Sequence, residues 1–379
     1  MKNILRIFIV VMFVAFACTV LLSATVHAEQ LTDNNGDDLF PRVNEKGDVV
    51  WYGDDGNDYE IFLYDGTEII QLTDNDYDDK FPEINDAGDV VWYGYDGNDL
   101  EIFLYDGTFP CQQLTSNNYT DYRPQINNAG DVVWYGNDEI DYEIFFYDGM
   151  LKTTIPLTNN DYDDKNPQIN DSGEVVWTGA GGDGDYEIFL YDGTDIIQLS
   201  ENTYDDTLPQ INGAGYVVWE GKVDDNDYEI FLYDGTDATR LTDNNYDDAN
   251  PQINEAGDVV WHGFFEASDG EIFLYDGITK TTTQLTDNDI NEIYAKLNDK
   301  GVVVWFGSED SVDEIYGYDG STIRQLTDNS YDDENPRINN DGYVVWCGAE
   351  GGNDKEIFLY KPKKDDDDDG WCFINTVSK

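Results

Sequence analysis

The sequence is poor in positively charged residues. It has 20 lysine and arginine residues against 81 aspartate and glutamate residues, which gives a net charge of −61. A chain with this charge is repelled by nucleic acid and by anionic lipid, and it attracts cations and basic partners. We therefore predict that the protein does not bind nucleic acid and that its partner is a protein or a cationic ligand.

Histidine and cysteine are also scarce, and their scarcity excludes several kinds of site. Only His262 lies beyond the first 28 residues, so no histidine-based zinc site is available. A lone histidine in a strand is more often packed than used as a base. Cys111, Cys347 and Cys372 occupy unrelated positions of the sequence pattern and form no disulfide framework, so their pairing stays open. The Gly-x-Ser-x-Gly and phosphate-loop motifs are missing too.

Long apolar runs are missing after residue 28. The first 28 residues predict a signal peptide over 1–28, because they combine a basic start, an apolar run over 7–22 and small residues at 26–28. An uncleaved membrane anchor and a lipoprotein modified at Cys18 are the weaker alternatives. No later stretch approaches the ~20 apolar residues that span a bilayer. We therefore predict an exported protein without a membrane span, placed in the periplasm, at the cell surface or outside the cell.

Aromatic residues, by contrast, make up 14% of the chain and recur at fixed positions. A Val-Val-Trp core returns every 41 to 44 residues, and a period of this length is typical of solenoids and propellers. The eight tryptophans of the repeat are Trp51, Trp92, Trp134, Trp177, Trp219, Trp261, Trp305 and Trp346.

Each repeat divides into four short segments rich in β-branched and aromatic residues. In the second repeat they are Phe81–Asn85, Asp89–Gly94, Glu101–Tyr105 and Cys111–Thr115. Such residues favour strands, and the Asn-Asp-Ala-Gly and Tyr-Asp-Gly stretches between them favour tight turns. Four antiparallel strands per repeat are typical of a β-propeller blade.

The two ends of the repeat region complete each other. The last repeat stops at Tyr360 without a Gln-Leu-Thr segment, and Gln30–Thr32 supply one at the other end. Pairing them would close the ring and remove an open sheet edge. We predict an all-β, eight-bladed propeller of four-stranded antiparallel blades over residues 29–361, a monomer, followed by an acidic disordered tail over 362–379.

The repeat resembles a known family. Its order of Leu-Thr, Pro-x-Ile-Asn-x-x-Gly-x-Val-Val-Trp and Glu-Ile-Phe-Leu-Tyr-Asp-Gly, over residues 30–361, is similar to the TolB-type propeller repeat, also called the WD-like Pro-Asp repeat. The family's Ser-Pro-Asp-Gly turn is replaced here, as at Asn85–Gly88, and the chain has no room for TolB's separate α/β domain. The resemblance implies the fold and an exported bacterial setting, and it does not carry over TolB's role in the cell envelope.

Acidic loops join the strands on one face of such a propeller. Asp74–Asp79 links the first blade to the second, and Tyr95–Asp99 joins two strands on the same face, so this face should be strongly negative. The alternate spacing of acidic and amide side chains raises the hypothesis of Ca²⁺ sites, and the sequence indicates no other cofactor. The candidate ligands are Asp74, Asp76, Asp78, Asn159, Asp161, Asp163, Asp243, Asn245, Asp247, Asp287, Asp289 and Asn291. The alternative is that these residues cap turns and attract cations only diffusely, since the glycine and distal glutamate of an EF-hand are missing.

The first strand of each blade lines the central channel. Arg42, Lys296 and Arg337 occupy the same repeat position and would make one side of the channel basic, so that a small anion or a peptide carboxylate binds there. The alternative is that these side chains only fill the channel. An asparagine that precedes the first turn occurs in all eight repeats, from Asn44 to Asn339, and we interpret it as a structural turn residue.

Two functions of different classes follow. The first is a non-enzymatic binding scaffold that uses the acidic face, with Ca²⁺ as a candidate ligand. The alternative is a carbohydrate-active enzyme, a polysaccharide lyase or glycosidase, that uses acidic loop residues. No catalytic residue is assigned from the sequence.

Overall fold

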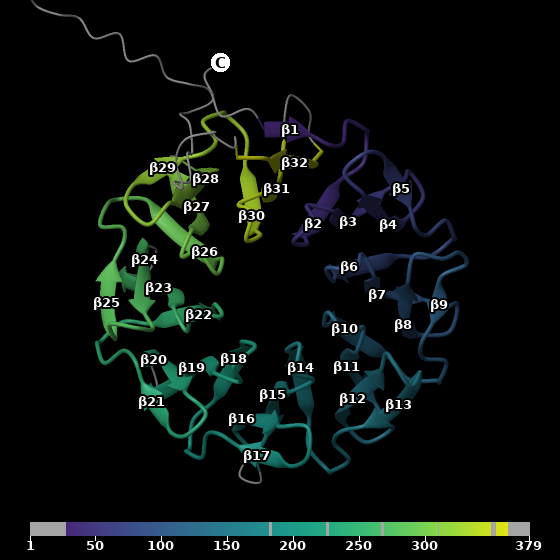
Figure 1. The fold of residues 1–379 in the computed structure, drawn as a ribbon, viewed down its shortest axis with the longest axis horizontal. Coiled ribbons are helices and arrows are strands. Elements are labelled where there is room, and N and C mark those ends of the chain that lie inside the picture. The colour runs from purple at the N-terminus through teal and green to yellow at the C-terminus, as the bar shows by residue number, and fades with distance from the viewer. Residues whose placement is uncertain are drawn as a thin grey trace, which may run out of the picture.

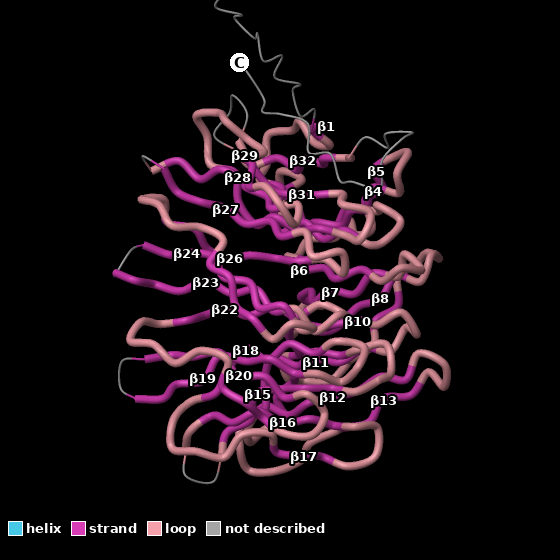
Figure 2. The backbone as a smooth tube through the Cα atoms, turned by 60° about the vertical axis from the view of Figure 1, so that its left-hand side comes forward, coloured by secondary structure: helices cyan, strands magenta, loops and turns pink. Residues whose placement is uncertain are grey.

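The computed structural model describes residues 28–181, 184–224, 227–266, 269–309, 311–349 and 354–362. The predicted signal peptide, except Ala28, and the predicted tail, except Pro362, lie outside the described residues, as does Cys372. The described chain forms 32 strands, which pair as eight four-stranded antiparallel sheets in a ring (Figure 1). The predicted eight-bladed propeller is thus confirmed, and Figure 2 shows the same ring turned by 60°, with strands and loops only.

Each blade runs outward from the channel through four strands, because short turns favour pairing of consecutive strands. The innermost strands are β2 (Asp38–Val43), β6 (Asp79–Ile84), β10 (Asp121–Ile126), β14 (Asp164–Ile169), β18 (Asp206–Ile211), β22 (Asp248–Ile253), β26 (Asn291–Leu297) and β30 (Asp333–Ile338). The second strands are β3 (Val49–Asp54), β7 (Val90–Tyr95), β11 (Val132–Asn137), β15 (Val175–Ala180), β19 (Val217–Asp224), β23 (Val259–Glu266), β27 (Val303–Glu309) and β31 (Val344–Gly348).

The two outer strands of each blade complete the sheet. The third strands are β4 (Tyr59–Tyr64), β8 (Leu100–Tyr105), β12 (Tyr142–Asp148), β16 (Tyr186–Tyr191), β20 (Asp227–Tyr233), β24 (Asp269–Asp276), β28 (Val312–Tyr318) and β32 (Glu356–Tyr360). The outermost strands are β5 (Ile69–Gln71), β9 (Gln112–Gln113), β13 (Thr153–Pro156), β17 (Ile196–Gln198), β21 (Ala238–Arg240), β25 (Thr281–Gln284), β29 (Ile323–Gln325) and β1 (Ala28–Gln30).

The N-terminal strand closes the ring. β1 pairs with β32 in antiparallel register from Ala28↔Tyr360 to Gln30↔Phe358, at the outer rim of the last blade (Figure 1). The strand begins two residues earlier than the predicted Gln30–Thr32. Leu31 still continues the ladder, because its amide donates to the Ile357 carbonyl oxygen at 2.7 Å.

The core lies between neighbouring blades. Val50 and Ile61 of the first blade pack on Val90 and Trp92 of the second, and all four are at most 1% exposed. The indole of Trp92 donates to Asp79 Oδ1 at 2.9 Å, which satisfies its buried N–H. The same tryptophan–aspartate bond, at 2.9 to 3.1 Å, recurs in five further blades. Each sheet is therefore covered on both faces, as its apolar second strand requires.

A ring of asparagines links the blades on the opposite side from the acidic loops. Each side-chain amide donates to the backbone oxygen of the equivalent asparagine in the next blade, at 2.8 to 3.1 Å, and Asn339 donates to Asn44 to complete the circle. The members are Asn44, Asn85, Asn127, Asn170, Asn212, Asn254, Asn298 and Asn339. All are buried, so these turn residues also fix one blade to the next.

A bulge shapes every innermost strand beside the channel. The residue before the proline position has a φ of +49° to +56°, as at Phe40 and Phe81, and the pairing with the second strand shifts at this point. Such a bulge bends the strand and re-aims the side chains that follow it. The next residue but one, Arg42 in the first blade, lines the channel cavity. The repeated bulge thus positions the channel side chains.

Candidate functional site

The central channel holds a cavity of about 410 Å³. Its walls come from the innermost strands, which surround the axis in Figure 1. The lining residues are Arg42, Phe81, Glu83, Arg123, Pro124, Gln125, Asn166, Pro167, Gln168, Leu208, Pro209, Gln210, Gln252, Lys296 and Arg337. Four of these are cationic and one is acidic. In a chain with a net charge of −61, this cavity is the basic exception.

Three of the cations belong to neighbouring blades at the ring closure. Lys296, Arg337 and Arg42 come from β26, β30 and β2, and their charges act on one another. Arg42 Nε lies 2.9 Å from both carboxylate oxygens of Glu83, so one positive charge is balanced. All three residues predicted to line the channel therefore share one cavity, and whether they bind an anion stays a prediction.

The electrostatics of this group single out Lys296. Burial, followed by the positive charges of Arg337 and Arg42, lowers the pKa of Lys296 well below its ordinary value of 10.5. Burial, followed by the positive charge of Arg42, lowers the pKa of Arg337 to about 9. Burial and the neighbouring positive charges thus favour the neutral form of the Lys296 amine. A guanidinium group such as that of Arg337 can bind a carboxylate.

Amide side chains line the other half of the cavity. Gln125, Gln210 and Gln252 each donate Nε2 to the carbonyl of the preceding proline, at 2.7 to 3.0 Å. Arg337 makes the equivalent bond to Pro336 at 2.9 Å. These local bonds hold the side chains in one orientation against the wall, which leaves a polar, pre-arranged surface around the open space.

A second polar system lies near the acidic loops, in every blade. In the first blade Glu60 is fully buried and accepts the Asn75 amide at 2.7 Å, while Asp79 accepts the Asn75 side chain at 2.6 Å. Burial raises the pKa of Glu60 to about 7 and that of Asp79 to about 6. These hydrogen bonds stabilise the loop between one blade and the next.

One residue of the first predicted calcium set, Asp74, belongs to a group of close carboxylates. Asp74 lies with Asp55 and Glu60, whose ligand atoms fall within 4.8 Å of one another, and neither Asp76 nor Asp78 belongs to this group. Asp78 instead accepts Lys80 Nζ at 2.7 Å and the Tyr59 amide at 3.2 Å.

Residues of the other predicted sets also accept hydrogen bonds, and their binding of Ca²⁺ stays a prediction. Asp163 accepts Lys165 Nζ at 2.6 Å and the Tyr142 amide at 3.2 Å. Asp247 accepts the Tyr228 amide at 3.0 Å, and Asn291 Oδ1 accepts the Gly270 amide at 2.9 Å. The remaining candidates, Asn159, Asp161, Asp243, Asn245, Asp287 and Asp289, lie in the same inter-blade loops, and Asp243 pairs with Arg240.

Sequence reasoning missed the buried glutamates of these groups. Glu60, Glu101 and Glu143 follow a tyrosine or leucine in the third strand of their blades, and each is at most 1% exposed. A charged residue that recurs inside an apolar strand was the available signal. It was hidden because acidic residues are so frequent around it.

Among the remaining chemistry-bearing side chains, His262 and Cys347 are buried and Cys111 is half-buried. His262 is 3% exposed against Phe264 and Tyr294, and burial lowers its pKa to about 4, so it is neutral at pH 7. Cys111 and Cys347 are free thiols. Nowhere in the described chain does a helix reach the length and apolarity needed to cross a bilayer.

No family model matches the sequence, and no curated protein does. Solved structures share the fold. The β-propeller domain of the Trilobed protease from Pyrococcus furiosus is 14% identical over 78% of this chain and 99% of that chain, with a TM-score of 0.56. An oligogalacturonate lyase in complex with manganese is 12% identical over 90% and 99%, with a TM-score of 0.55. Pyrococcus horikoshii acylaminoacyl peptidase is 15% identical over 83% and 57%, with a TM-score of 0.52.

These neighbours are enzymes or parts of enzymes, which contradicts the expectation of a non-enzymatic binding scaffold. They agree better with the alternative, an enzyme that acts on carbohydrate. The scaffold hypothesis was based on the net negative charge and therefore on the acidic loops, whereas the lining of the enclosed cavity is basic. At this level of identity the likeness shows the fold alone.

Proposed function

We propose that the protein is a polysaccharide lyase that cleaves a uronate-containing oligosaccharide in the channel cavity. The observation that carries the proposal is the cluster of Lys296, Arg337 and Arg42 in an otherwise acidic molecule. A uronate carries one carboxylate per sugar, and arginine binds carboxylates with paired hydrogen bonds. The oligogalacturonate lyase supports the proposal because the match spans 99% of its length, whereas the acylaminoacyl peptidase extends well beyond the matched part.

The chemistry follows from the positions of the charges. In a β-elimination, a base removes the proton from the carbon next to the carboxylate, the bond to the leaving sugar oxygen breaks, and a carbon–carbon double bond forms. The neutral amine of Lys296 would take the proton. Arg337 would bind the carboxylate and stabilise the negative charge that develops on it. The displaced sugar oxygen receives a proton from water.

The cavity does not suit a manganese ion. Its one carboxylate, that of Glu83, is already held by Arg42, and the described lining contains no histidine. Arginine, lysine and glutamine side chains offer few of the oxygen and imidazole ligands that Mn²⁺ prefers. We therefore derive no step through a metal.

We also propose that the chain belongs with the TolB-type repeat proteins and is exported. The support is the order of Leu-Thr, Pro and Glu-Ile-Phe-Leu-Tyr-Asp-Gly in the repeats, together with the basic, apolar and small-residue segments before residue 29.

The test is turnover of defined uronate oligomers, galacturonate oligomers first, followed by ultraviolet absorbance of the unsaturated product. Lys296→Gln should lower kcat by about 10²- to 10⁴-fold, the range for loss of a general base. Arg337→Gln should raise KM and lower kcat together. Lys46→Gln, at an exposed lysine outside the cavity lining, serves as the control and should retain full activity. Wild-type kcat in Lys296→Gln, or hydrolysis products without a double bond, would refute the proposal.

A further inference from the structure

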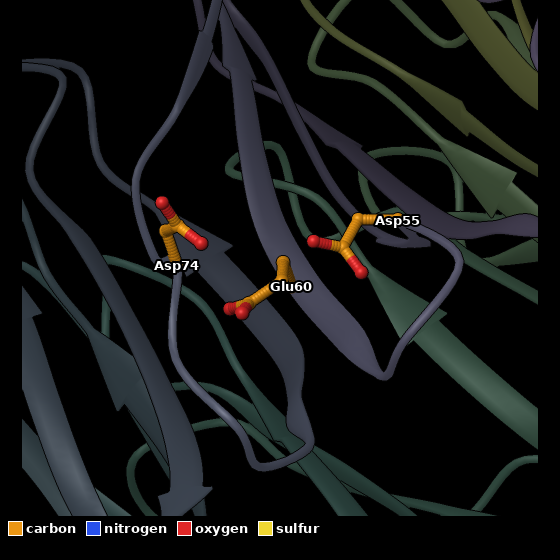
Figure 3. A group of neighbouring side chains, drawn as sticks. All are labelled: Asp55, Glu60 and Asp74. Atoms are coloured by element: carbon orange, nitrogen blue, oxygen red, sulfur yellow. The ribbon is translucent and has the colours of Figure 1, made fainter.

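Three neighbouring blades hold carboxylate groups of one design outside the channel. Each group combines an aspartate of the loop between the second and third strands with the buried glutamate of the third strand. The three groups are Asp55 with Glu60 and Asp74, Asp96 with Asp99 and Glu101, and Asp138 with Asp141 and Glu143. In each group the ligand atoms lie within 4.8 Å of one another. Figure 3 shows the first group, with Glu60 between Asp55 and Asp74.

Several buried oxygens of these groups have no hydrogen-bond partner. Glu60 and Glu101 are fully buried, and Oε1 of each accepts the backbone amide of Asn75 or Asn117. The hydroxyl of Thr73 or Thr115 also interacts with the carboxylate, but Oε2 itself has no partner in place. Asp141 is 7% exposed, and neither of its carboxylate oxygens has a partner. Burying an ionised carboxylate without a partner is costly unless a cation compensates it.

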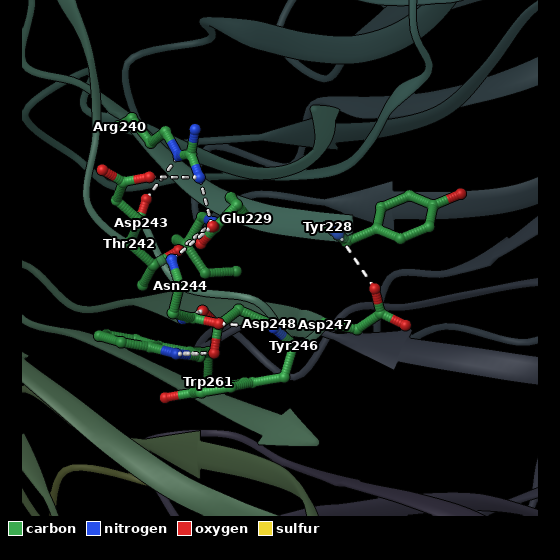
Figure 4. A network of polar contacts seen from close by, with 11 residues as sticks. Tyr228, Glu229, Arg240, Thr242, Asp243, Asn244, Tyr246, Asp247, Asp248 and Trp261 are labelled. Atoms are coloured by element: carbon green, nitrogen blue, oxygen red, sulfur yellow. Dashed lines mark hydrogen bonds and ion pairs between the residues drawn. The ribbon is translucent and has the colours of Figure 1, made fainter. Parts of the chain in front are cut away.

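The fifth blade supplies that cation from its own sequence. Arg240 Nη2 forms an ion pair with Glu229, and it lies 3.0 Å from Asp243 (Figure 4). Glu229 and Asp243 are the repeat equivalents of Glu60 and Asp74. A guanidinium group thus stands between the same two carboxylates that are left without a cation in the first blade.

The residue at the arginine position faces the group in another blade as well. Gln113 of the second blade is the equivalent of Arg240, and its Nε2 donates to Asp96 Oδ2 at 3.3 Å. The first blade has Gln71 at this position. A glutamine at this position brings no positive charge to the carboxylates of its blade.

We propose that the groups of the first three blades each bind one Ca²⁺ ion and that Arg240 replaces the ion in the fifth blade. Hard oxygen ligands suit Ca²⁺, and its bond lengths of about 2.3–2.6 Å place opposite ligands up to roughly 5 Å apart. The ligand atoms of each group lie within 4.8 Å of one another, close enough to bind one such ion. These sites differ from the alternate-residue sets predicted in the inter-blade loops, and they are independent of the channel chemistry.

The repeat offers a reciprocal experiment with Ca²⁺ as the probe. Equilibrium dialysis and calorimetry on the full chain in ~0.15 M NaCl should give an integral number of bound ions. Gln71→Arg should lower that number by one, and Arg240→Gln should raise it by one. Glu60→Gln should also lower it by one, whereas Glu229→Gln in the fifth blade should leave it unchanged as the matched control.

Circular dichroism of each variant shows whether the propeller is intact, and Asp55→Asn, at an exposed position, repeats the test of the first blade should Glu60→Gln fail to fold. Unchanged binding in both Gln71→Arg and Asp55→Asn would overturn the proposal. So would Ca²⁺ binding that disappears in ~0.5 M NaCl, because diffuse attraction to surface charges is screened at that ionic strength whereas chelation is not.

Discussion

Replacing Asn127 by alanine should destabilise the propeller far more than replacing its neighbour. The Asn127 Oδ1 atom accepts the amides of Ala129 and Asp131 at 3.0 and 2.9 Å. Its Nδ2 donates to Asp131 Oδ2 and to the Asn170 carbonyl, both at 3.1 Å. Four hydrogen bonds at about 1 kcal/mol each, at a buried site, give a loss of about 4 kcal/mol in the free energy of unfolding.

The control lies one residue along the chain. Asn128 also bonds to both neighbouring blades, through Asp86 and Asp171, but it is exposed. Asn128→Ala should cost less than about 1 kcal/mol, because water replaces the lost bonds.

Differential scanning calorimetry measures the difference. With an unfolding entropy of about 2 cal/mol/K per residue, the Asn127→Ala variant should melt about 6 °C below the wild type. Equal melting temperatures for the Asn127 and Asn128 variants would refute the reasoning that burial makes the asparagine ring a link between blades.

Three further predictions concern the core and the ring. Burial raises the pKa of Asp38 and of Asp333 to about 7, so the folded state binds more protons than the unfolded state between pH ~4 and ~7. In chelator, stability should therefore fall as the pH rises from ~5.5 to ~7, by up to about 1.4 kcal/mol per group for each pH unit, and then level off; a higher Tm at pH ~8 than at pH ~5.5 would contradict this. In Gly136→Ala the new Cβ would lie 1.9 Å from Asp121 Oδ1, so the hydrogen bond from the Trp134 indole to Asp121 should break. The free energy of unfolding should fall by at least ~2 kcal/mol, and the near-ultraviolet circular dichroism spectrum should change. An unchanged Tm would contradict this. Deleting residues 28–30 exposes the edge of β32 and should lower Tm and promote self-association, which light scattering detects; a stable monomer would contradict this.

Much of the fold was predictable because it depends on periodic local signals. The tryptophan period gave the number of blades, and the turn residues marked the strand ends. What the pattern did not reveal are contacts between repeats. The Asn127 side chain satisfies its own turn, and nothing local indicates that it also reaches Asn170.

The candidate sites were less predictable for a related reason. Arg42, Lys296 and Arg337 were placed in the channel because they share a repeat position. Glu60 was overlooked because its partners, Asp55 and Asp74, lie in two different loops. The predicted Ca²⁺ ligands were chosen by their spacing along one loop, whereas the carboxylate group of Asp55, Glu60 and Asp74 combines two loops and a strand.

The pairing of β1 with β32 has a consequence for how the molecule folds. Nearly all other strand pairs join consecutive segments, so each blade forms from contacts that are close in sequence, and local contacts favour fast folding. The pairing of Ala28 with Tyr360 joins the two described strands that are most distant in sequence. Its entropic cost is that of closing a loop over all of the repeats. Among the described strands, β1 is synthesised first and can pair only after β32 has been synthesised, so the blades form an open arc until then.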